Sequence, residues 1–259
     1  MSKHEPRALA EAAARTPSLP TGDDERFIGY GVMGMTFASG HCLALRHFPT
    51  SSIGPGYRAV WHRDPAGRWV VYADAPPTQS CARYLGAALA ASHTARVTIS
   101  WNASRSLTVQ VDDVLAWSME LADTAATRLM SIMGAHTPDA LWRSTMVLRG
   151  MGAVAGPLLS VGRVRLTGTT PNGQRCRANP RRVWSIPKSD ATLRGEDLGP
   201  QGPLPQQARL GDIWIPQRAI FFADATARFT ATDSSVRTRP GERDARQVPR
   251  PDRVRQGER

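Results

Sequence analysis

The chain has 259 residues and a formal net charge of +11, and hydrophobic residues make up 41% of it. That length is enough for one large domain whose core needs no disulfides, and the composition is typical of a globular protein. All the basic residues except Lys3 and Lys188 are arginines. Neither lysine stands in the context of a phosphate-binding Walker loop or of the third strand of a protein kinase, so both classes are excluded.

The cysteines are three in number, widely spaced and without a C-x-x-C pair, and they predict free thiols in a reducing compartment. The start of the chain has no apolar run typical of a signal peptide. The charge-free stretch from Phe27 to Leu45 contains glycines and polar residues, which suit a buried hairpin better than a membrane span. We therefore expect a cytoplasmic protein with no transmembrane segment. No histidine motif for a metal is present, and we expect no cofactor and no metal.

Composition divides the chain into three parts. Residues 1–26 are rich in Ala, Pro and acids and predict a flexible, partly helical N-terminal arm. Residues 27–236 predict a single β-rich domain. Residues 237–259 are rich in arginine with few large aliphatic residues, and this composition predicts a disordered tail.

The predicted domain begins with a glycine-rich segment. Residues Gly29 to Gly34 match G-x-G-x-x-G, but no acidic residue follows before Asp64 and the flanking residues are typical of a strand rather than of a helix start. We interpret the segment as a strand whose glycines allow another segment to approach closely.

Two antiparallel units follow, and both can be aligned from their patterns. Asp64-Pro65-Ala66-Gly67 predicts a hairpin turn that pairs His62 with Val70, Val60 with Tyr72 and Arg58 with Asp74. A three-stranded meander over 97–119 pairs Trp101 with Leu107 and Val109 with Trp117, which places the apolar residues on one face.

The hydrophobic period then changes to that of a helix. Between Asp123 and Ser160 we predict two helices, the first capped by Asp123 or Thr124 and the second beginning at Thr137-Pro138-Asp139. Beyond them, Asn172-Gly173 predicts a hairpin between strands 163–170 and 174–179, and further strands are expected at 181–186 and 213–223. The fold class predicted is predominantly antiparallel β, barrel-like or α+β, with a two-helix insertion around 124–160.

One face of the first hairpin holds the best candidates for chemistry. Arg58, His62, Tyr72 and Asp74 combine an imidazole, a phenol and an ion pair on a half-apolar face, which could act as an acid–base set in a cavity. An ordinary wetted outer face is the alternative for each residue taken singly. The candidate ligand-binding residues are on neighbouring strands and on the methionine-rich helix: His41, Trp61, Met130 and Met133.

Three short runs carry a resemblance to known proteins. In Tyr57 to Trp69, Gln79-Ser80-Cys81 and Thr170 to Gln174 the chain resembles a family of uncharacterised proteins from GC-rich bacteria, over residues 27–222. That resemblance implies no activity. The meander is also similar to lipocalin-like (calycin) barrels, some of which bind or modify isoprenoids, and this likeness implies a barrel with an interior cavity. The chain lacks the early G-x-W of true lipocalins, so the likeness is one of architecture.

Two functions from different classes follow. The first is binding of a small, largely apolar molecule in a barrel-like cavity, extended in one version to its conversion by an isomerase, hydratase or cyclase that needs no cofactor. The second is a non-catalytic interaction protein whose arginine-rich surface meets an acidic partner, nucleic acid or anionic lipid. Arginine in place of lysine is typical of a GC-rich genome, so we do not expect nucleic acid, whereas peripheral contact with an anionic membrane stays open.

Overall fold

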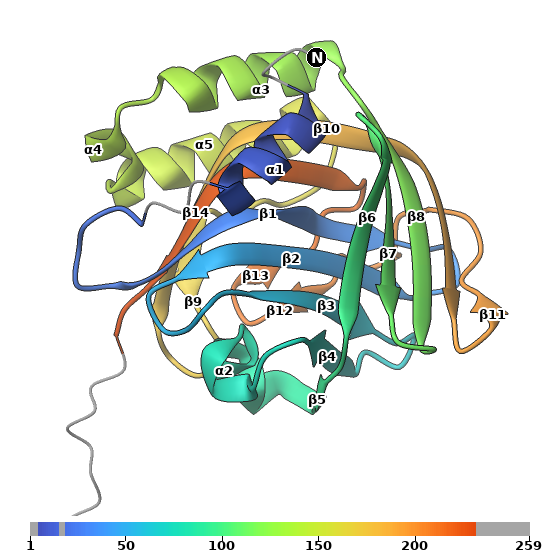
Figure 1. The fold of residues 1–259 in the computed structure, drawn as a ribbon. Coiled ribbons are helices and arrows are strands. Elements are labelled where there is room, and N and C mark those ends of the chain that lie inside the picture. Colours follow the sequence, from blue (N-terminus) through green and yellow to red (C-terminus); the bar gives the residue numbers. More distant parts are fainter. Residues whose placement is uncertain (1–4, 16–18, 232–259) are drawn as a thin grey trace, which may run out of the picture.

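The computed structural model describes residues 5–15 and 19–231 of the chain. Its centre is a 12-stranded, mostly antiparallel sheet with helices packed against it (Figure 1). The predicted fold class is confirmed. Ten strands follow one another across the sheet in the order β5 (Leu89–Thr94), β4 (Trp69–Ala73), β3 (Tyr57–Arg63), β2 (Cys42–Ser51), β1 (Glu25–Thr36), β14 (Ile220–Phe229), β10 (Arg175–Leu193), β8 (Leu115–Ala122), β7 (Ser106–Val111) and β6 (Val97–Ala103).

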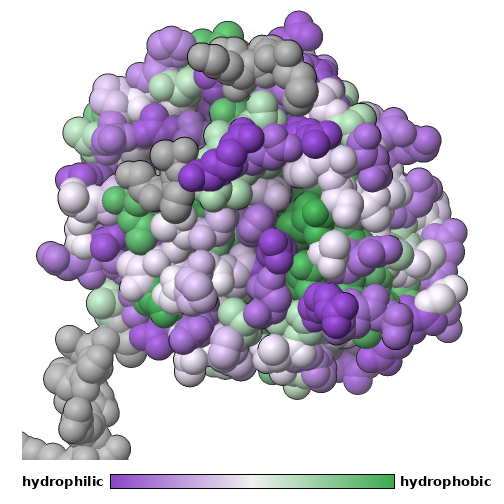
Figure 2. Space-filling model, viewed as in Figure 1, coloured by the Kyte–Doolittle hydropathy of each residue, from purple (hydrophilic) through white to green (hydrophobic). Residues whose placement is uncertain are grey.

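The sheet curls until its two ends face each other. One buried cluster contains residues from β1–β4 and also from β6–β8, which is how a barrel-like core forms. Within the described strands β5 pairs with β4 and β6 pairs with β7, so the barrel stays open between these two edges. Figure 2, viewed as in Figure 1, shows that hydrophobic residues, in green, reach the surface between hydrophilic ones, in purple.

Short strands and helices complete the fold. Strands β9 (Thr167–Thr169) and β11 (Glu196–Asp197) pair with β10, while β12 (Arg209–Leu210) and β13 (Ile213–Trp214) form a separate hairpin. The helix α2 (Ala82–Leu85) lies between two 3₁₀ turns, Pro77–Gln79 and Gly86–Ala88. Together with the outer face of β2–β4, its side chains Tyr84 and Leu85 form a second buried cluster.

The predicted registers are confirmed. In the first hairpin His62 pairs with Val70 and Val60 pairs with Tyr72. In the meander Trp101 pairs with Leu107, and Val109 pairs with Trp117. Both registers are set by the local sequence, because they depend on the alternation of apolar and polar side chains along each strand and on the residues of the connecting turn. Gly67 takes the positive φ of 89° that the predicted turn requires.

The structure joins two predicted strands into one. Residues 174–179 and 181–186 lie in the same strand, β10, which runs on to Leu193. Pro180 is accommodated because it lies between the end of the β9 ladder at Arg177 and the start of the β8 ladder at Ser185, where β10 pairs only with β14 and its other side is unpaired. The strand predicted over 213–223 is divided between β13 and β14.

The glycine-rich segment is part of β1. A Cβ on Gly29 would lie 1.9 Å from the carbonyl oxygen of His47, and one on Gly31 would lie 2.1 Å from that of Leu45. The glycines therefore allow β2 to approach β1 closely, as the sequence pattern indicated.

Three helices follow one another on the outside of the sheet (Figure 1): α3 (Ala125–His136), α4 (Asp139–Trp142) and α5 (Thr145–Leu159). Helix α3 packs on β10, and side chains of α3 and α5 share a buried cluster with residues of β10 and β14. Thr124 caps α3 as predicted, by accepting a hydrogen bond from the N–H of Thr127. Where the sequence predicted one second helix, the structure has two: α4 makes a single turn, and α5 begins as a separate helix after Ser144. Pro157 lies inside the last turn of α5 and does not end the helix before it.

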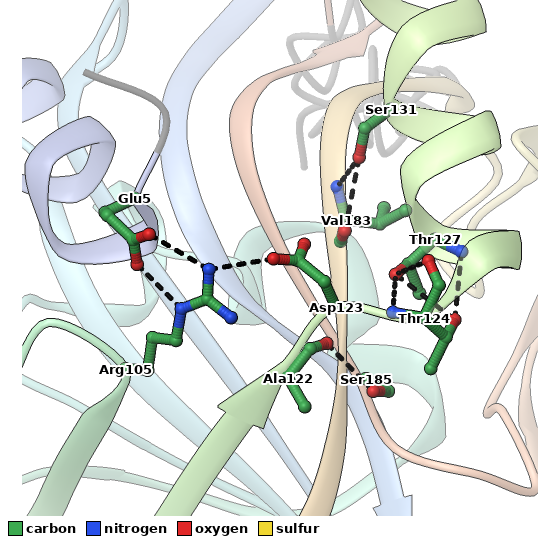
Figure 3. A network of polar contacts seen from close by, with 9 residues as sticks. All are labelled: Glu5, Arg105, Ala122, Asp123, Thr124, Thr127, Ser131, Val183 and Ser185. Carbon is green, nitrogen blue, oxygen red and sulfur yellow. Dashed lines mark hydrogen bonds and ion pairs between the residues drawn. The ribbon is translucent and has the colours of Figure 1, made fainter. Parts of the chain in front are cut away.

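A chain of polar contacts fixes α3 to the sheet (Figure 3). The Ser131 hydroxyl donates to the carbonyl of Val183 at 3.2 Å and accepts from its N–H at 3.0 Å. Arg105 on the turn before β7 pairs with both Glu5 and Asp123. Through Arg105, Asp123 at the start of α3 is linked to Glu5, the residue that precedes α1 (Pro6–Arg15).

The helix α1 packs against β1 and β14, with Ala10 in the barrel core. The N-terminal arm predicted over residues 1–26 stays a prediction. The tail predicted over 237–259 lies outside the described residues. No helix of the described part is long and apolar enough to span a bilayer.

Candidate functional site

The face predicted for chemistry is divided into separate pairs of side chains. Arg58 and Asp74 are cross-strand neighbours: the Asp74 carboxylate accepts from the Arg58 N–H at 2.6 Å and lies 3.2 Å from its guanidinium. This pair is at the solvent-exposed end of β3. Tyr72 faces the barrel core, and its ring stacks on that of His93 with centroids 5.4 Å apart.

His62 forms a pair with His41. Nδ1 of His41 and Nε2 of His62 are 2.9 Å apart, and the two rings are stacked. Burial lowers the pKa of both imidazoles, that of His62 to about 4. At neutral pH the pair is therefore uncharged and shares one hydrogen bond, and the low pKa makes His62 a weak base. Its acid–base role stays a prediction.

The other predicted ligand-binding residues lie elsewhere. Trp61 is on the opposite face of β3, where its indole N–H donates to Sγ of Cys81 at 2.9 Å. Met130 is on the buried side of α3, in a cluster with Val183 and Phe222. Met133 points outward and is 39% exposed. Helix α3, which carries both methionines, packs on β10 and not on the His62 face. The structure thus brings together His41 with His62 and Arg58 with Asp74, but not the eight residues as one set.

A partly open cavity of about 120 Å³ lies on the Trp61 side of the sheet. Its floor comes from four adjacent strands, β2, β1, β14 and β10, and its wall from the segments 164–166 and 213–216. Most of the lining is apolar, and it includes Met33, Phe48, Val164, Trp214 and Phe222. Such a mixture of an apolar wall and a few polar groups is typical of a small-molecule site.

Two arginines line this cavity, Arg46 on the sheet and Arg165 on the wall, where Arg165 pairs with Asp212. Arg46 alternates along β2 with Leu45 and His47, whose side chains face the barrel core, and therefore faces the cavity side. Its guanidinium lies 4.3 Å from the centre of the Trp61 ring and 5.5 Å from that of Phe222. Both contacts are cation–π interactions. They fix the guanidinium against the floor of the cavity.

Backbone carbonyls supply the hydrogen bonds of Arg46. Its Nη1 donates to the carbonyls of Val32 and Leu45, and its Nη2 donates to that of Met33 at 3.3 Å. Burial lowers the pKa of the guanidinium to about 10, which still leaves it charged at neutral pH. The charge is thus held in place by neutral partners.

No carboxylate among the described residues forms an ion pair with Arg46. This differs from Arg58, Arg83 and Arg105, each of which lies within 4 Å of an acidic side chain. An enclosed charge without a counter-ion is costly. A guanidinium held in this way is ready to bind an anion, and its planar donors fit a carboxylate.

A second polar group without a partner lies across the cavity. The side-chain oxygen of Asn179, on β10, is buried and accepts no hydrogen bond from any residue that the structure describes. Because β1 and β14 run between β2 and β10, Asn179 and Arg46 mark the two sides of the cavity. One can bind an anionic group and the other a hydrogen-bond donor.

Among the described residues, the cavity lining lacks the side chains that Schiff-base or metal chemistry needs. Lys188 lies on the exposed edge of β10, 3.3 Å from Glu120, so it offers no amine to this cavity for a Schiff base. Between residues 5 and 15 and from 19 to 231, no group of three or more His, Cys, Asp or Glu side chains is placed to hold a metal ion.

Comparisons with known proteins give a likeness of fold. No protein-family model and no curated protein matches the chain. Among solved structures, it is similar to one titled "Structural Studies of Acetoacetate Decarboxylase", with a TM-score of 0.40 and 11% identity over 83% of this chain and 89% of that one. An acetoacetate decarboxylase from Legionella pneumophila gives a TM-score of 0.35 and 10% identity over 83% of this chain and 90% of that one. No residue role is carried over from either.

Sequence reasoning did not select Arg46 or Asn179. A signal for Arg46 was available, because it is the single charged residue in the strand-like run from Cys42 to Phe48. Asn179 carries no such signal. Its significance depends on the approach of β10 to β14 and of the segment 164–166, which no local pattern predicts.

Proposed function

We propose that the protein binds a small organic acid in the cavity between Arg46 and Asn179. The ligand's carboxylate would pair with the Arg46 guanidinium, and its short apolar body would lie against Phe222 and Trp214. This gives a chemical class to the small, largely apolar ligand expected from the sequence, and it moves the site to the other face of the sheet.

The single observation that carries the proposal is the unpaired charge of Arg46. A fully apolar ligand would leave this guanidinium without a counter-ion, whereas a carboxylate would supply one together with two hydrogen bonds. Charge-assisted hydrogen bonds of this kind contribute about 1.5–3 kcal/mol each. An acid should therefore be preferred over its neutral analogue.

The size of the cavity limits the ligand. A volume of about 120 Å³ is close to that of engineered cavities that bind benzene, of roughly 150 Å³. Short branched or aromatic acids such as isobutyrate, 3-methylbutyrate and benzoate are of this size. The proposal is confined to binding, because none of the described lining residues is a histidine, an acid or a cysteine that could transfer a proton near neutral pH.

Ligand-observed NMR with the full chain tests the proposal. The panel would contain these three acids, their amides and the corresponding alcohols, each measured with the wild-type protein, with Arg46→Met and with Arg68→Met. Arg68 is a matched control, because it is exposed in the β3–β4 turn and pairs with Asp64. We expect acids to bind to the wild type and the control and to be lost with Arg46→Met. Binding of amides as strongly as acids would refute an anion site.

A further inference from the structure

The outer face of the helical layer is unusually apolar. Of the residues that the structure describes, six large hydrophobic side chains are exposed, and all six are in α3, α4 or α5. They are Leu129 (46% exposed), Ile132 (55%), Met133 (39%), Leu141 (46%), Met146 (83%) and Val154 (50%). We call these six residues the helical face. A grouping of this kind marks an interaction surface, whereas scattered exposed hydrophobic residues need no explanation.

Helical spacing explains why these side chains point outward. In α3, Leu129, Ile132 and Met133 are three and four residues apart and form one stripe, while Met130 and Ser131 occupy the buried side against β10. A surface helix normally has polar residues on the side away from the core. Here both sides of α3 are apolar, so the outer side is built to contact something other than water.

The charges on this layer that lack an ion-pair partner among the described residues are positive. Residues 125–159 contain exposed Arg128, Arg143 and Arg149 and one acidic residue, Asp139, whose carboxylate pairs with Arg181. The helical face is therefore bordered by unpaired positive charge.

A basic groove continues the positive charge beside α5. The groove has a volume of about 740 Å³ and runs between α5 and the segment 162–169. Five arginines line it against one aspartate, Asp212, which pairs with Arg165. The arginines of this groove, here called the arginine groove, are Arg149, Arg163, Arg165, Arg175 and Arg177. Arg149 belongs to α5, so the arginine groove and the helical face share an element.

We infer that the helical face and the arginine groove together form a docking surface for an anionic membrane. Apolar side chains of α3–α5 would enter the headgroup boundary, and the arginines would bind lipid phosphates, which is how amphipathic helices bind at a bilayer surface. The binding depends on both parts, since basic residues attract the anionic surface and apolar burial retains the protein there.

Charge complementarity selects this occupant over two others. A symmetric dimer through the helical face would bring Arg128, Arg143 and Arg149 of two copies towards each other, and these like charges would repel. A nucleic acid would satisfy the arginines, but it would leave the apolar side chains against a phosphate backbone with nothing to bury them. Of these three occupants, only an anionic bilayer offers both negative charge and apolar depth.

Vesicle sedimentation with the full chain tests the inference. Vesicles of phosphatidylcholine alone and of phosphatidylcholine with phosphatidylglycerol would be mixed with the wild type, an Ile132→Ser/Met146→Ser double variant, Arg149→Glu and Arg96→Glu. Ile132 and Met146 are exposed, so their replacement should leave the thermal transition in place. Arg96 lies in the turn between β5 and β6, and its variant makes the same change in net charge away from the surface.

We expect binding to the anionic vesicles and little to phosphatidylcholine alone. The double variant should reduce the partition coefficient about tenfold or more, and Arg149→Glu should reduce it by about fivefold or more, while Arg96→Glu should stay close to wild type. Equal losses with Arg149→Glu and Arg96→Glu would overturn the inference, as would unchanged binding of the double variant.

Two further outcomes would assign the surface to another partner and overturn the inference. In sedimentation velocity without vesicles, a dimer that the double variant dissociates would assign the helical face to a second copy of the chain. Binding of a labelled single-stranded oligonucleotide that is lost with Arg149→Glu and kept in the double variant, together with no vesicle binding, would assign the arginine groove to nucleic acid.

Discussion

The guanidinium of Arg46 lies 4.3 Å from the centre of the Trp61 ring, on the side of the sheet that faces the cavity. Trp61 was selected from the sequence as a ligand-binding residue. In the structure it is outside the cavity lining and contacts the group that we propose as the anion site. It is thus a positioning residue for Arg46.

Replacing Trp61 should weaken the binding of an acid without abolishing it. Phe presents a weaker negative face to a cation than Trp does, so Trp61→Phe should reduce affinity for isobutyrate by about threefold, or roughly 0.7 kcal/mol. Isothermal titration calorimetry measures this change. Cys81→Ala is the matched control, because it removes the partner of the Trp61 N–H and leaves the ring over Arg46. Unchanged affinity in Trp61→Phe would show that the cation–π contact does not hold the site.

Stability should fall on acidification because of buried histidines. Burial lowers the pKa of His47 from 6.5 to about 4. Between these values the unfolded chain binds a proton that the folded chain does not, so the contribution of neutral His47 is complete above pH 6.5 and is lost as the pH falls towards 4. One such histidine should lower the free energy of unfolding by roughly 2 kcal/mol between pH 7 and pH 5.

A phenylalanine at position 47 should reduce this pH dependence. Nδ1 of His47 has no hydrogen-bond partner, and the ring packs edge-on against Tyr30, so Phe fits the same space. Urea denaturation of His47→Phe at pH 7 and pH 5 should give a smaller difference than that of the wild type. His136→Phe, at an exposed position at the end of α3, should leave the difference unchanged. The account is contradicted if the two variants behave alike.

Two glycine substitutions should have opposite effects. A Cβ on Gly29 would meet the His47 carbonyl oxygen at 1.9 Å, so Gly29→Ala should separate β1 from β2 and destabilise the fold by about 3 kcal/mol or more. Gly150 is exposed in α5 and has no atom within 4 Å of its Cβ position. Gly150→Ala should stabilise by about 0.5–1 kcal/mol, because alanine favours a helix. Denaturation midpoints compare the two, and a tolerated Gly29→Ala would refute the close approach.

Loss of the cap of α3 should be measurable on its own. The Thr124 hydroxyl accepts from the N–H of Thr127, and the Thr127 hydroxyl accepts from the N–H of Thr124 in return. Thr124→Ala should therefore cost about 1 kcal/mol in the free energy of unfolding. Thr124→Ser keeps the hydroxyl and should cost little. Equal losses in the two variants would assign the effect to the methyl group of threonine rather than to the cap.

Local patterns predicted what depends on neighbours in sequence. The pairing of Arg58 with Asp74 follows from the turn at Asp64 to Gly67 and from a two-residue period, and the cap at Thr124 follows from a change of period. The long strand β10 was predicted in pieces, since Pro180 is compatible with a strand only where a neighbour is missing. That neighbour is set by the tertiary fold and not by the local sequence.

The candidate site was beyond local patterns for the same reason. Arg46 and Asn179 are 133 positions apart in the chain, and they line one cavity because β1 and β14 lie between β2 and β10. The pattern placed His62 and Tyr72 correctly on one face. It could not say that the rings would stack with His41 and His93, because these partners come from other strands and loops.

The central claim, that Arg46 recognises a carboxylate, is tested most directly by a calorimetric cycle. Isobutyrate and isobutyramide would each be titrated into the wild type and into Arg46→Met, after circular dichroism has shown that the variant is folded. We predict that the wild type prefers the acid by about tenfold or more, as a charge-assisted pair requires, and that Arg46→Met removes this preference and leaves amide binding nearly unchanged. The same preference for the acid in both proteins would contradict the account.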